Sequence, residues 1–391
     1  MSLAASVVIV GAGPAGLLLG NILADHGVDC LILERHTREH IERRPRAGLI
    51  EHWAVRELTE LGLADRLLAE GARHDSCEFR FLGRRNVSRY GDLAGGRAHY
   101  VYPQQELVKD MVAAYLKKGG QLRFSAPAVT IDGFHDRPRV TFEEAGVTRT
   151  ARGEVVAGCD GFHGAARASV PPDAVTRYEH QHRDGWLAVL AAAPPSTEQI
   201  IYALHPDGFA GHMLRSPTVS RYYLQCPAGD ASENWSDDRI WSELRRRLAT
   251  SDDWTLRDGP ILDKGVLDMR SWVGEPMRFG NLCLAGDAAH ILTPAGAKGM
   301  NLALGDAREL ALGLLDRFHR GDDRRLLAYS ETRLEAVWRA QEFSNWLLDL
   351  LHGTGDDAQP RPFADRLRRQ AIGQITGGGA RARAFAESYV G

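Results

Sequence analysis

The segment Val7-Val8-Ile9-Val10-Gly11-Ala12-Gly13-Pro14-Ala15-Gly16 decides the fold of this chain. Its first four residues are continuously apolar and β-branched, which is typical of a buried parallel strand. The glycines that follow have separate tasks: Gly11 permits a tight turn, Gly13 lets a pyrophosphate approach the backbone, and Gly16 lets helix and strand pack closely. We therefore expect a strand, a phosphate-binding turn and a helix to about residue 26.

A second strand is expected at residues 28–33, and Glu34 closes it. An acidic residue about 20 positions after the glycines is placed to bind a ribose hydroxyl. A glycine-rich turn in an unrelated α/β protein would give the same three glycines. It would not also give the strand, the helix and the terminal acid. The segment therefore predicts a Rossmann-like, dinucleotide-binding βαβ unit.

Two further motifs follow buried strands. Cys159-Asp160-Gly161 comes after the apolar run 155–158, and Gly286-Asp287-Ala288-Ala289-His290 comes after the run 281–285. Asp287, placed after a glycine turn, suits an acceptor for the ribityl hydroxyls of FAD. A single Asp-Gly turn is common in proteins of every kind, so each motif alone is weak.

The stretch 294–301 adds glycines in front of a long helix that we expect at residues 299–318. Backbone N–H groups there can approach a ring, and the helix N-terminus would stabilise negative charge on the N1–C2=O edge of a reduced flavin. The three motifs in this order favour FAD over NAD as the bound cofactor.

Composition excludes several classes of function. The chain has 391 residues, 25% charged and 44% hydrophobic, with a formal net charge of −3. A near-neutral balance argues against nucleic acid or an anionic membrane as the main partner. The five cysteines form no CxxC pair, so we expect reduced thiols and no metal site. No signal peptide or membrane span is evident, which predicts a cytoplasmic protein.

The remaining patterns predict a discontinuous α/β chain. Amphipathic helices are expected at 54–70 and 106–117, and strands of a more antiparallel sheet at 186–191, 199–203 and 220–225. We expect an FAD-binding domain with an inserted mixed or antiparallel β-sheet substrate domain, followed by a helical C-terminal region. The FAD-binding domain would comprise 1–73, 100–180 and 271–320, the substrate domain 74–99 and 181–270, and the helical region 321–391.

Over nearly its whole length the chain resembles the class A flavoprotein aromatic hydroxylases. The segments that carry the resemblance are 44–48, 157–164, 201–203, 205–210, 220–223, 284–301 and 389–391. The AGDAAH segment at 285–290 marks the wider superfamily only. The segments IYA at 201–203 and SRYY at 220–223 point to hydroxylases of benzoates.

The resemblance implies an NAD(P)H-consuming monooxygenase. Its reduced flavin would react with O₂ to give an electrophilic C4a-hydroperoxide. The enzyme would hydroxylate 4-hydroxybenzoate, or a close para-substituted benzoate, ortho to the phenol, and form 3,4-dihydroxybenzoate. The resemblance also suggests a homodimer. NADPH and NADH both remain open, because His40 stands where NADPH-preferring members carry tyrosine.

The resemblance also assigns roles to individual residues. FAD would be held by Gly11, Gly13, Gly16, Glu34, Arg46, Gln104, Asp287, Gly299 and Asn301, and positioned by Arg221. NAD(P)H would meet Arg44, His163 and Arg270, with Asp160 in an element shared by both nucleotides. Arg215 and Tyr223 would bind the substrate carboxylate, and Tyr202 and the carbonyl of Pro294 would bind the phenol. Tyr389 and His74 would continue a proton path to solvent.

The chemistry explains these residue types. A phenolate attacks an electrophilic oxygen faster than a phenol does, so the site must remove a proton, and histidine titrates near neutral pH. A guanidinium clamps a carboxylate through two hydrogen bonds and so fixes which ring carbon faces the flavin.

The sequence departs from the family in the substrate pocket. Met213 replaces a serine, Ala295 a threonine and Leu204 an asparagine. The pocket therefore keeps its arginine but loses polar neighbours, which leaves the exact substrate open. Two other interpretations are a halogenase or reductase of the same superfold, and a non-enzymatic flavin-binding sensor. The absence of a Trp-x-Trp-x-Ile-Pro segment weighs against the halogenase.

Overall fold

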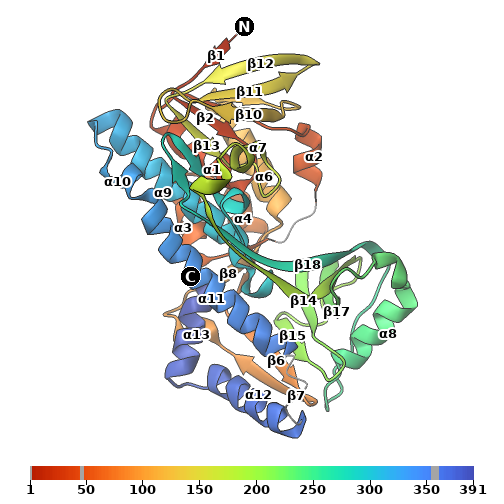
Figure 1. Ribbon diagram of the computed structural model, residues 1–391. Coiled ribbons are helices and arrows are strands. Elements are labelled where there is room, and N and C mark those ends of the chain that lie inside the picture. The colour runs from red at the N-terminus through yellow and green to blue at the C-terminus, as the bar shows by residue number, and fades with distance from the viewer. Residues whose placement is uncertain (1, 45–47, 354–360) are drawn as a thin grey trace.

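A computed structural model of the chain describes residues 2–44, 48–353 and 361–391. Figure 1 shows two layered parts joined by long strands, with the N-terminus at the far end of one part and the C-terminus near the junction. The fold is the expected α/β class: a Rossmann-like parallel sheet, a second mixed sheet and a helical C-terminal region. Within the described residues no helix is long and apolar enough to cross a membrane.

The first part is built on a six-stranded sheet in the order β19-β20-β13-β2-β3-β9. All its neighbouring strands pair in parallel except β19 with β20. The strands are β2 (Val7–Val10), β3 (Cys30–Leu33), β9 (Gln121–Arg123), β13 (Val155–Gly158), β19 (Arg278–Phe279) and β20 (Leu282–Leu284). Every residue of β2 is buried, as its continuous apolar run predicts.

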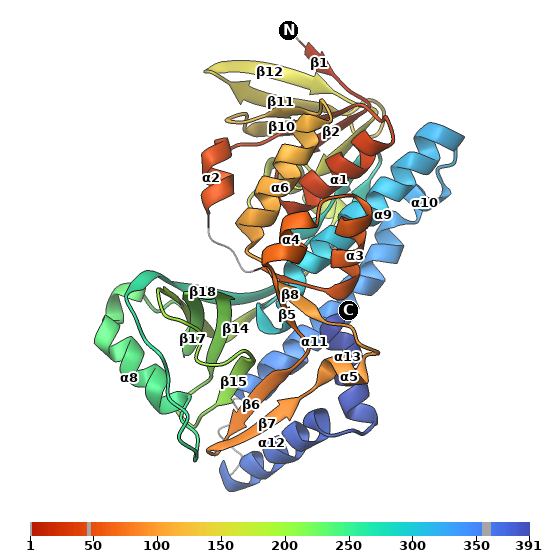
Figure 2. The ribbon, with the colours of Figure 1, turned by 180° about the vertical axis from the view of Figure 1, so that it is seen from behind.

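Helices cover this sheet. In Figure 2, α1 (Pro14–Asp25) lies between α6 (Gln104–Lys117) and α9 (Lys298–Arg320), and it contacts both. The other helices here are α2 (Arg38–Arg43) and α7 (Ala165–Ala168). A small sheet of β1 (Ser2–Ala4), β10 (Ala128–Asp132), β11 (Arg139–Glu144) and β12 (Val147–Arg152) lies at the outer end.

The second part is built on an eight-stranded sheet in the order β21-β18-β14-β17-β16-β15-β6-β7. Its strands are β6 (Cys77–Phe81), β7 (Arg84–Ser88), β14 (Thr176–Ala191), β15 (Ile200–Leu204), β16 (Ala210–Ser216), β17 (Val219–Pro227), β18 (Ile261–Glu275) and β21 (His290–Ile291). Helix α8 (Asp237–Arg247) packs its apolar side against β17. Figure 1 shows β14 and β18 running from the first part into the second.

The C-terminal helices close the second sheet. They are α10 (Arg324–Leu327), α11 (Tyr329–His352), α12 (Arg361–Thr376) and α13 (Ala380–Val390). Helix α11 contacts α9, β15 and β18, while α13 contacts α5 (Tyr90–Leu93) and α12 contacts β7. A three-stranded sheet of β4 (Leu49–Ile50), β5 (Ala72–His74) and β8 (His99–Val101) lies between the two parts.

Several element boundaries differ from expectation by one or two residues, and two elements differ by more. The single helix expected at 54–70 is two helices, α3 (His52–Glu60) and α4 (Asp65–Glu70), because Gly62 adopts φ +65° and ends the first. The strand expected at 186–191 is only the end of β14, whose first half is polar and exposed. We propose the three-part division given above. It is supported by β6 and β7, which belong to the same sheet as the strands from β14 to β18.

A buried charge cluster holds the loop after β20 against the helices. Asp306 of α9 is fully buried, and its Oδ2 accepts hydrogen bonds from the Gly286 N–H at 2.9 Å and from His290 Nε2 at 2.6 Å. Its Oδ1 accepts from Arg333 Nε of α11 at 2.7 Å. Burial opposes the charge, but His290 and Arg333 outweigh it and hold the pKa of Asp306 below its usual value.

Asp306→Ala should lower the free energy of unfolding by about 3–5 kcal/mol, because it leaves the Arg333 guanidinium and the Gly286 N–H buried without their acceptor. The matched control is Glu335→Ala, which breaks the exposed pair of Glu335 with Arg339 and should change stability by about 0.5 kcal/mol or less. Denaturant titration measures both. Equal losses for the two variants would show that the cluster does not hold the loop.

Candidate active site

A cavity of about 690 Å³ lies where the parallel strands end. Its lining includes the residues that directly follow β2, β3, β13 and β20, namely Gly11, Glu34, Cys159 and Ala285. In open α/β sheets this edge is the ligand-binding edge, because the strand order reverses there and leaves a crevice. The cavity continues to the second sheet, where Tyr202, Met213 and Tyr223 line it.

The glycine turn after β2 leaves no room for side chains at two of its positions. Gly11 has φ +103°, and a Cβ there would lie 2.4 Å from the Cys159 carbonyl oxygen. A Cβ on Gly16 would lie 2.0 Å from the Gly11 carbonyl oxygen, so α1 rests directly on the turn. At Gly13 the space is open, and no atom lies within 4 Å of the point that a Cβ would occupy. A phosphate can therefore approach the first N–H groups of α1 at Gly13.

Glu34 is fixed by backbone donors at the end of β3. Its Oε2 accepts from the Ala12 N–H at 2.8 Å and its Oε1 from the His36 N–H at 2.8 Å. The side chain is buried yet lines the cavity. Each carboxylate oxygen keeps a further lone pair, so this geometry suits a ribose hydroxyl.

Two aspartates mark the far side of the crevice. Asp160 Oδ2 accepts from the Ala166 N–H at 2.9 Å, while its buried Oδ1 has no partner among the described residues. Burial raises the pKa of Asp160. Asp287 is exposed at the turn where Gly286 adopts φ +62°, and α9 begins close by at Lys298. Free acceptors and a helix N-terminus around one crevice fit a dinucleotide such as FAD.

The other end of the cavity carries a pair of buried tyrosines. Tyr202 of β15 lines the cavity, and its hydroxyl lies 2.7 Å from that of Tyr389 on α13. Burial raises the pKa of both phenols, so both are neutral at physiological pH. Two hydroxyls at this distance share one hydrogen bond and can pass a proton along it.

Two histidines lie beyond Tyr389. The ring of His99 packs edge-on against Tyr389 at 4.9 Å, and its Nδ1 lies 3.3 Å from the hydroxyl of Tyr90. His74 is buried, and its Nε2 has no hydrogen-bond partner within the described part of the chain. Burial lowers the pKa of His74 to about 4 and that of His99 well below its usual value. Sequence analysis missed His99, because a lone histidine in a short strand carries no motif.

Sequence analysis also missed Lys298, although a lysine inside an otherwise apolar glycine segment is a signal. Its Nζ donates to Glu51 Oε1 at 2.6 Å and to the carbonyl of Tyr389 at 2.9 Å. The ammonium therefore ties the start of α9 to the C-terminal helix that carries Tyr389.

Arg215 lies at the end of β16 and is 7% exposed. Burial, and next the like charge of Arg221, lower the pKa of Arg215 to about 10, so it is still a cation at neutral pH. In the β16–β17 pair, Met213 is opposite Arg221, and Gly211 is opposite Tyr223. A buried cation beside a tyrosine can hold an anion such as a carboxylate.

The structure brings most of the predicted residues to one cavity. Those that line it are Gly11, Gly13, Glu34, Arg44, Gln104, Asp160, His163, Tyr202, Met213, Tyr223, Asp287, Pro294 and Gly299. Those that lie outside the lining are Gly16, His74, Arg215, Arg221, Arg270, Asn301 and Tyr389. Arg46 falls outside the described residues.

Asn301 and Arg270, which lie outside the lining, interact with other parts of the protein. The Asn301 side chain accepts from the Glu51 N–H at 2.9 Å and donates to the Leu49 carbonyl at 2.9 Å, which fixes β4 on α9. Arg270 of β18 lies 3.8 Å from Glu179.

Comparison with known proteins agrees with this geometry. The family described as "FAD binding domain" matches residues 4–344. The p-hydroxybenzoate hydroxylase of Acinetobacter baylyi is 39% identical over 385 residues, which cover 98% of this chain and 95% of the relative. The 3-amino-4-hydroxybenzoate 2-monooxygenase of Streptomyces cremeus is 26% identical, with 88% of this chain and 87% of the relative covered.

Among solved structures, p-nitrophenol 4-monooxygenase from Pseudomonas putida DLL-E4 superposes with a TM-score of 0.83 at 20% identity, over 100% of this chain and 99% of that one. An identity this low shows a shared fold. The match to the FAD-binding family and the relative of nearly equal length show more: this chain belongs to the class A flavoprotein aromatic hydroxylases and is an FAD-dependent monooxygenase.

Proposed function

We propose that this enzyme hydroxylates 4-hydroxybenzoate, or a close para-substituted benzoate, ortho to its phenol. The product would be 3,4-dihydroxybenzoate, and the co-substrates O₂ and either NADPH or NADH. The observation that carries the proposal is the hydrogen bond of 2.7 Å between Tyr202, which lines the cavity, and Tyr389 behind it. A phenolic substrate needs such a proton acceptor, and the Acinetobacter relative is named for this substrate.

FAD, when bound, supplies electrons from NAD(P)H and the activation of O₂. Glu34, Gln104, Asp287 and the N–H groups at Gly13 and Gly299 would hold it, with Arg46, Arg221 and Asn301 as further proposed contacts. Arg44, Asp160, His163 and Arg270 would meet the nicotinamide coenzyme. We also propose a homodimer in the cytoplasm, in keeping with the free cysteines of the described chain.

The tyrosine pair would remove the phenolic proton. The substrate hydroxyl donates to the Tyr202 oxygen while the Tyr202 O–H donates to Tyr389, so neither neutral tyrosine has to carry a charge. Pro294 lines the same cavity, and we propose its carbonyl as a second acceptor for the phenol. We propose that the path continues from Tyr389 toward His74, whose buried Nε2 has no hydrogen-bond partner among the described residues. The ring carbon ortho to the phenolate would then be electron-rich, as hydroxylation by the oxygen that bound FAD activates requires.

Arg215 and Tyr223 would orient the ring by its carboxylate, at the opposite end from Tyr202. Burial of this end excludes water, which protects the activated oxygen from decay to H₂O₂. Met213 lines this end as well, and a thioether is a weak acceptor with no proton to donate. The pocket should therefore accept ring-substituted analogues such as 3-amino-4-hydroxybenzoate.

The first experiment follows NAD(P)H oxidation by the purified yellow protein with and without 4-hydroxybenzoate. We expect strong stimulation by the benzoate, no need for halide, and 3,4-dihydroxybenzoate as the product identified by chromatography. Oxidation without stimulation would indicate a reductase, turnover that requires halide a halogenase, and inert flavin a sensor. Each of those outcomes contradicts the proposal.

Arg215→Ala should weaken 4-hydroxybenzoate binding by about 2–4 kcal/mol, because two charge-assisted hydrogen bonds are lost. Equilibrium dialysis of the FAD-loaded protein measures the dissociation constant. The control is Arg245→Ala, an exposed arginine of α8 outside the cavity, which should bind as the parent does. An unchanged constant for Arg215→Ala would remove this residue from the carboxylate site.

Tyr202→Phe should still bind substrate and consume NAD(P)H but release mostly H₂O₂, because the phenol is no longer deprotonated before oxygen transfer. The yield of hydroxylated product per NAD(P)H measures this. Tyr222→Phe is the control, since that buried hydroxyl donates to the Arg257 carbonyl at 2.9 Å, away from the cavity. Equal yields in the Tyr202 variant and the parent would count decisively against the relay.

Met213→Ser should bind 4-hydroxybenzoate more tightly by about 1 kcal/mol or more, because the serine hydroxyl adds a hydrogen bond to a charged group. It should also narrow the range of substituted benzoates accepted, since methionine adapts to irregular shapes and serine does not. A panel of 3-substituted benzoates tests parent and variant. No gain in affinity together with an unchanged panel would show that Met213 does not contact the carboxylate.

A further inference from the structure

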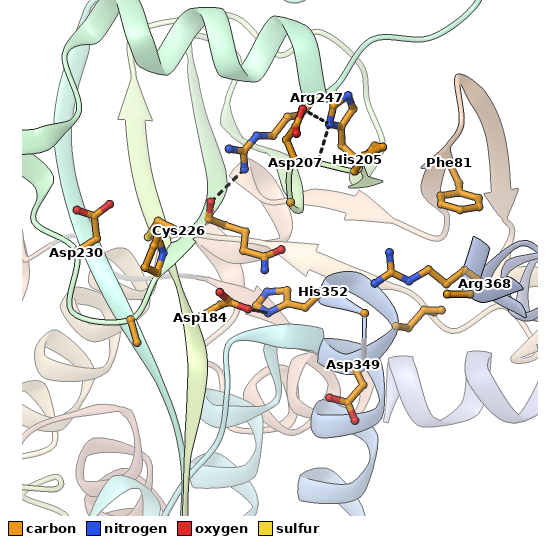
Figure 3. A pocket seen from close by; sticks show the side chains of 18 of the residues that line it. Phe81, Asp184, His205, Asp207, Cys226, Asp230, Arg247, Asp349, His352 and Arg368 are labelled. Atoms are coloured by element: carbon orange, nitrogen blue, oxygen red, sulfur yellow. Dashed lines mark hydrogen bonds and ion pairs between the residues drawn. The ribbon is translucent and has the colours of Figure 1, made fainter. Parts of the chain in front are cut away.

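A second and larger cavity, of about 1600 Å³, is lined by Asp184, His352 and Arg368 among other residues (Figure 3). It is a groove between the end of α11, helix α12 and the loop at 205–208. Figure 3 shows His352, the last residue of α11, facing Asp184 in this groove. Trp186, by contrast, lines the substrate pocket.

A hydrogen bond crosses the wall between the two cavities. The indole Nε1 of Trp186 donates to His352 Nε2 at 2.6 Å. An indole N–H can only donate, so this Nε2 carries no proton and the neutral ring carries it on Nδ1. That Nδ1 lies 3.7 Å from Asp184 Oδ2. Burial lowers the pKa of His352 to about 3, so the ring remains a neutral acceptor throughout the physiological range.

The fold brings Asp184, Trp186 and His352 together. Asp184 and Trp186 are two residues apart in β14, within a regular stretch of pairing with β17, so their side chains point to the same face. Helix α11 crosses that face and ends at His352, because Gly353 adopts φ +86°. Asp184, at 37% side-chain exposure, faces solvent, whereas His352 is 8% exposed.

The indole shapes the pocket through its neighbours. The Trp186 ring stacks on Phe209 at 4.6 Å and tilts against Tyr223 at 5.1 Å. All three rings line the substrate cavity, and together they form its aromatic wall. Tyr223 is also the residue proposed above to hold the substrate carboxylate, so the indole packs directly against a residue that would orient the substrate.

We propose that His352 is a positioning residue for hydroxylation: from the outer groove it holds the Trp186 indole by its N–H and thereby fixes the aromatic wall against which the substrate ring lies. The proposal rests on the benzoate hydroxylation proposed above. Without its acceptor the indole N–H is left unpaired at a buried site, which favours rotation of the ring toward water in the groove. The wall then loosens, and substrate is held less firmly.

The test compares His352→Ala with His352→Gln, whose amide oxygen can still accept the indole N–H. We expect His352→Ala to raise the KM for 4-hydroxybenzoate about three- to tenfold, the range for one lost hydrogen bond, and to release more H₂O₂. His352→Gln should stay within about twofold of the parent. His205→Ala, a histidine of the same groove that bonds to Asp207, is the control and should leave KM unchanged.

A double-mutant cycle separates positioning from general stability. In a Trp186→Phe background no indole N–H remains, so adding His352→Ala should change KM no further. A full additional effect in that background, or equal effects of the alanine and glutamine variants, would overturn the proposal.

A second readout does not depend on the substrate. The near-ultraviolet circular dichroism difference between the parent and Trp186→Phe isolates the signal of this indole. His352→Ala should abolish that signal and His352→Gln should keep it. If the parent does not hydroxylate 4-hydroxybenzoate, the proposed substrate fails while this spectrum still decides the role of His352. An unchanged signal in His352→Ala would show that His352 does not position the ring.

Discussion

The contact between Gly16 and the carbonyl of Gly11 is the constraint on which the rest of the structure depends. A Cβ at residue 16 would lie 2.0 Å from that oxygen, so α1 can rest on the turn after β2 only because residue 16 is glycine. This closeness brings the start of α1 to the edge of the sheet, where β3, β13 and β20 also end. The crevice, its acidic acceptors and the phosphate position all follow from it.

The second requirement is that distant segments meet behind the substrate. Tyr202 and Tyr389 are 187 residues apart, yet their hydroxyls share a hydrogen bond. Lys298 fixes the C-terminal helix in this position, because its ammonium donates hydrogen bonds both to Glu51 and to the carbonyl of Tyr389. The start of α9, which we propose lies against the flavin, is therefore tied directly to the helix that carries the inner tyrosine of the relay.

Features whose determinants lie close together in the chain could be predicted from the sequence, whereas contacts between distant segments could not. The βαβ unit, the motif at 286–290 and the long helix α9 were recognisable because turn chemistry and periodicity lie within a few residues of each other. Gly62 is a signal for the break between α3 and α4, but the amphipathic periodicity on both sides of it predicted one continuous helix. His99 and His352 were not predictable, because each acquires its partner only when a strand or helix from another part of the chain packs beside it.

The long paired strands β14 and β18 connect the two parts of the molecule rigidly. A paired ribbon resists bending along its length, whereas a single-chain linker would not. The pairing of β14 with β18 shifts register at two places, between Gln181 and Gly185 and between Leu190 and Ala191. Such a shift bends the strands and increases their twist locally. Asp184 lies at the first of these shifts and faces His352, so the local bend of the strands and the groove behind the pocket's aromatic wall meet at one residue.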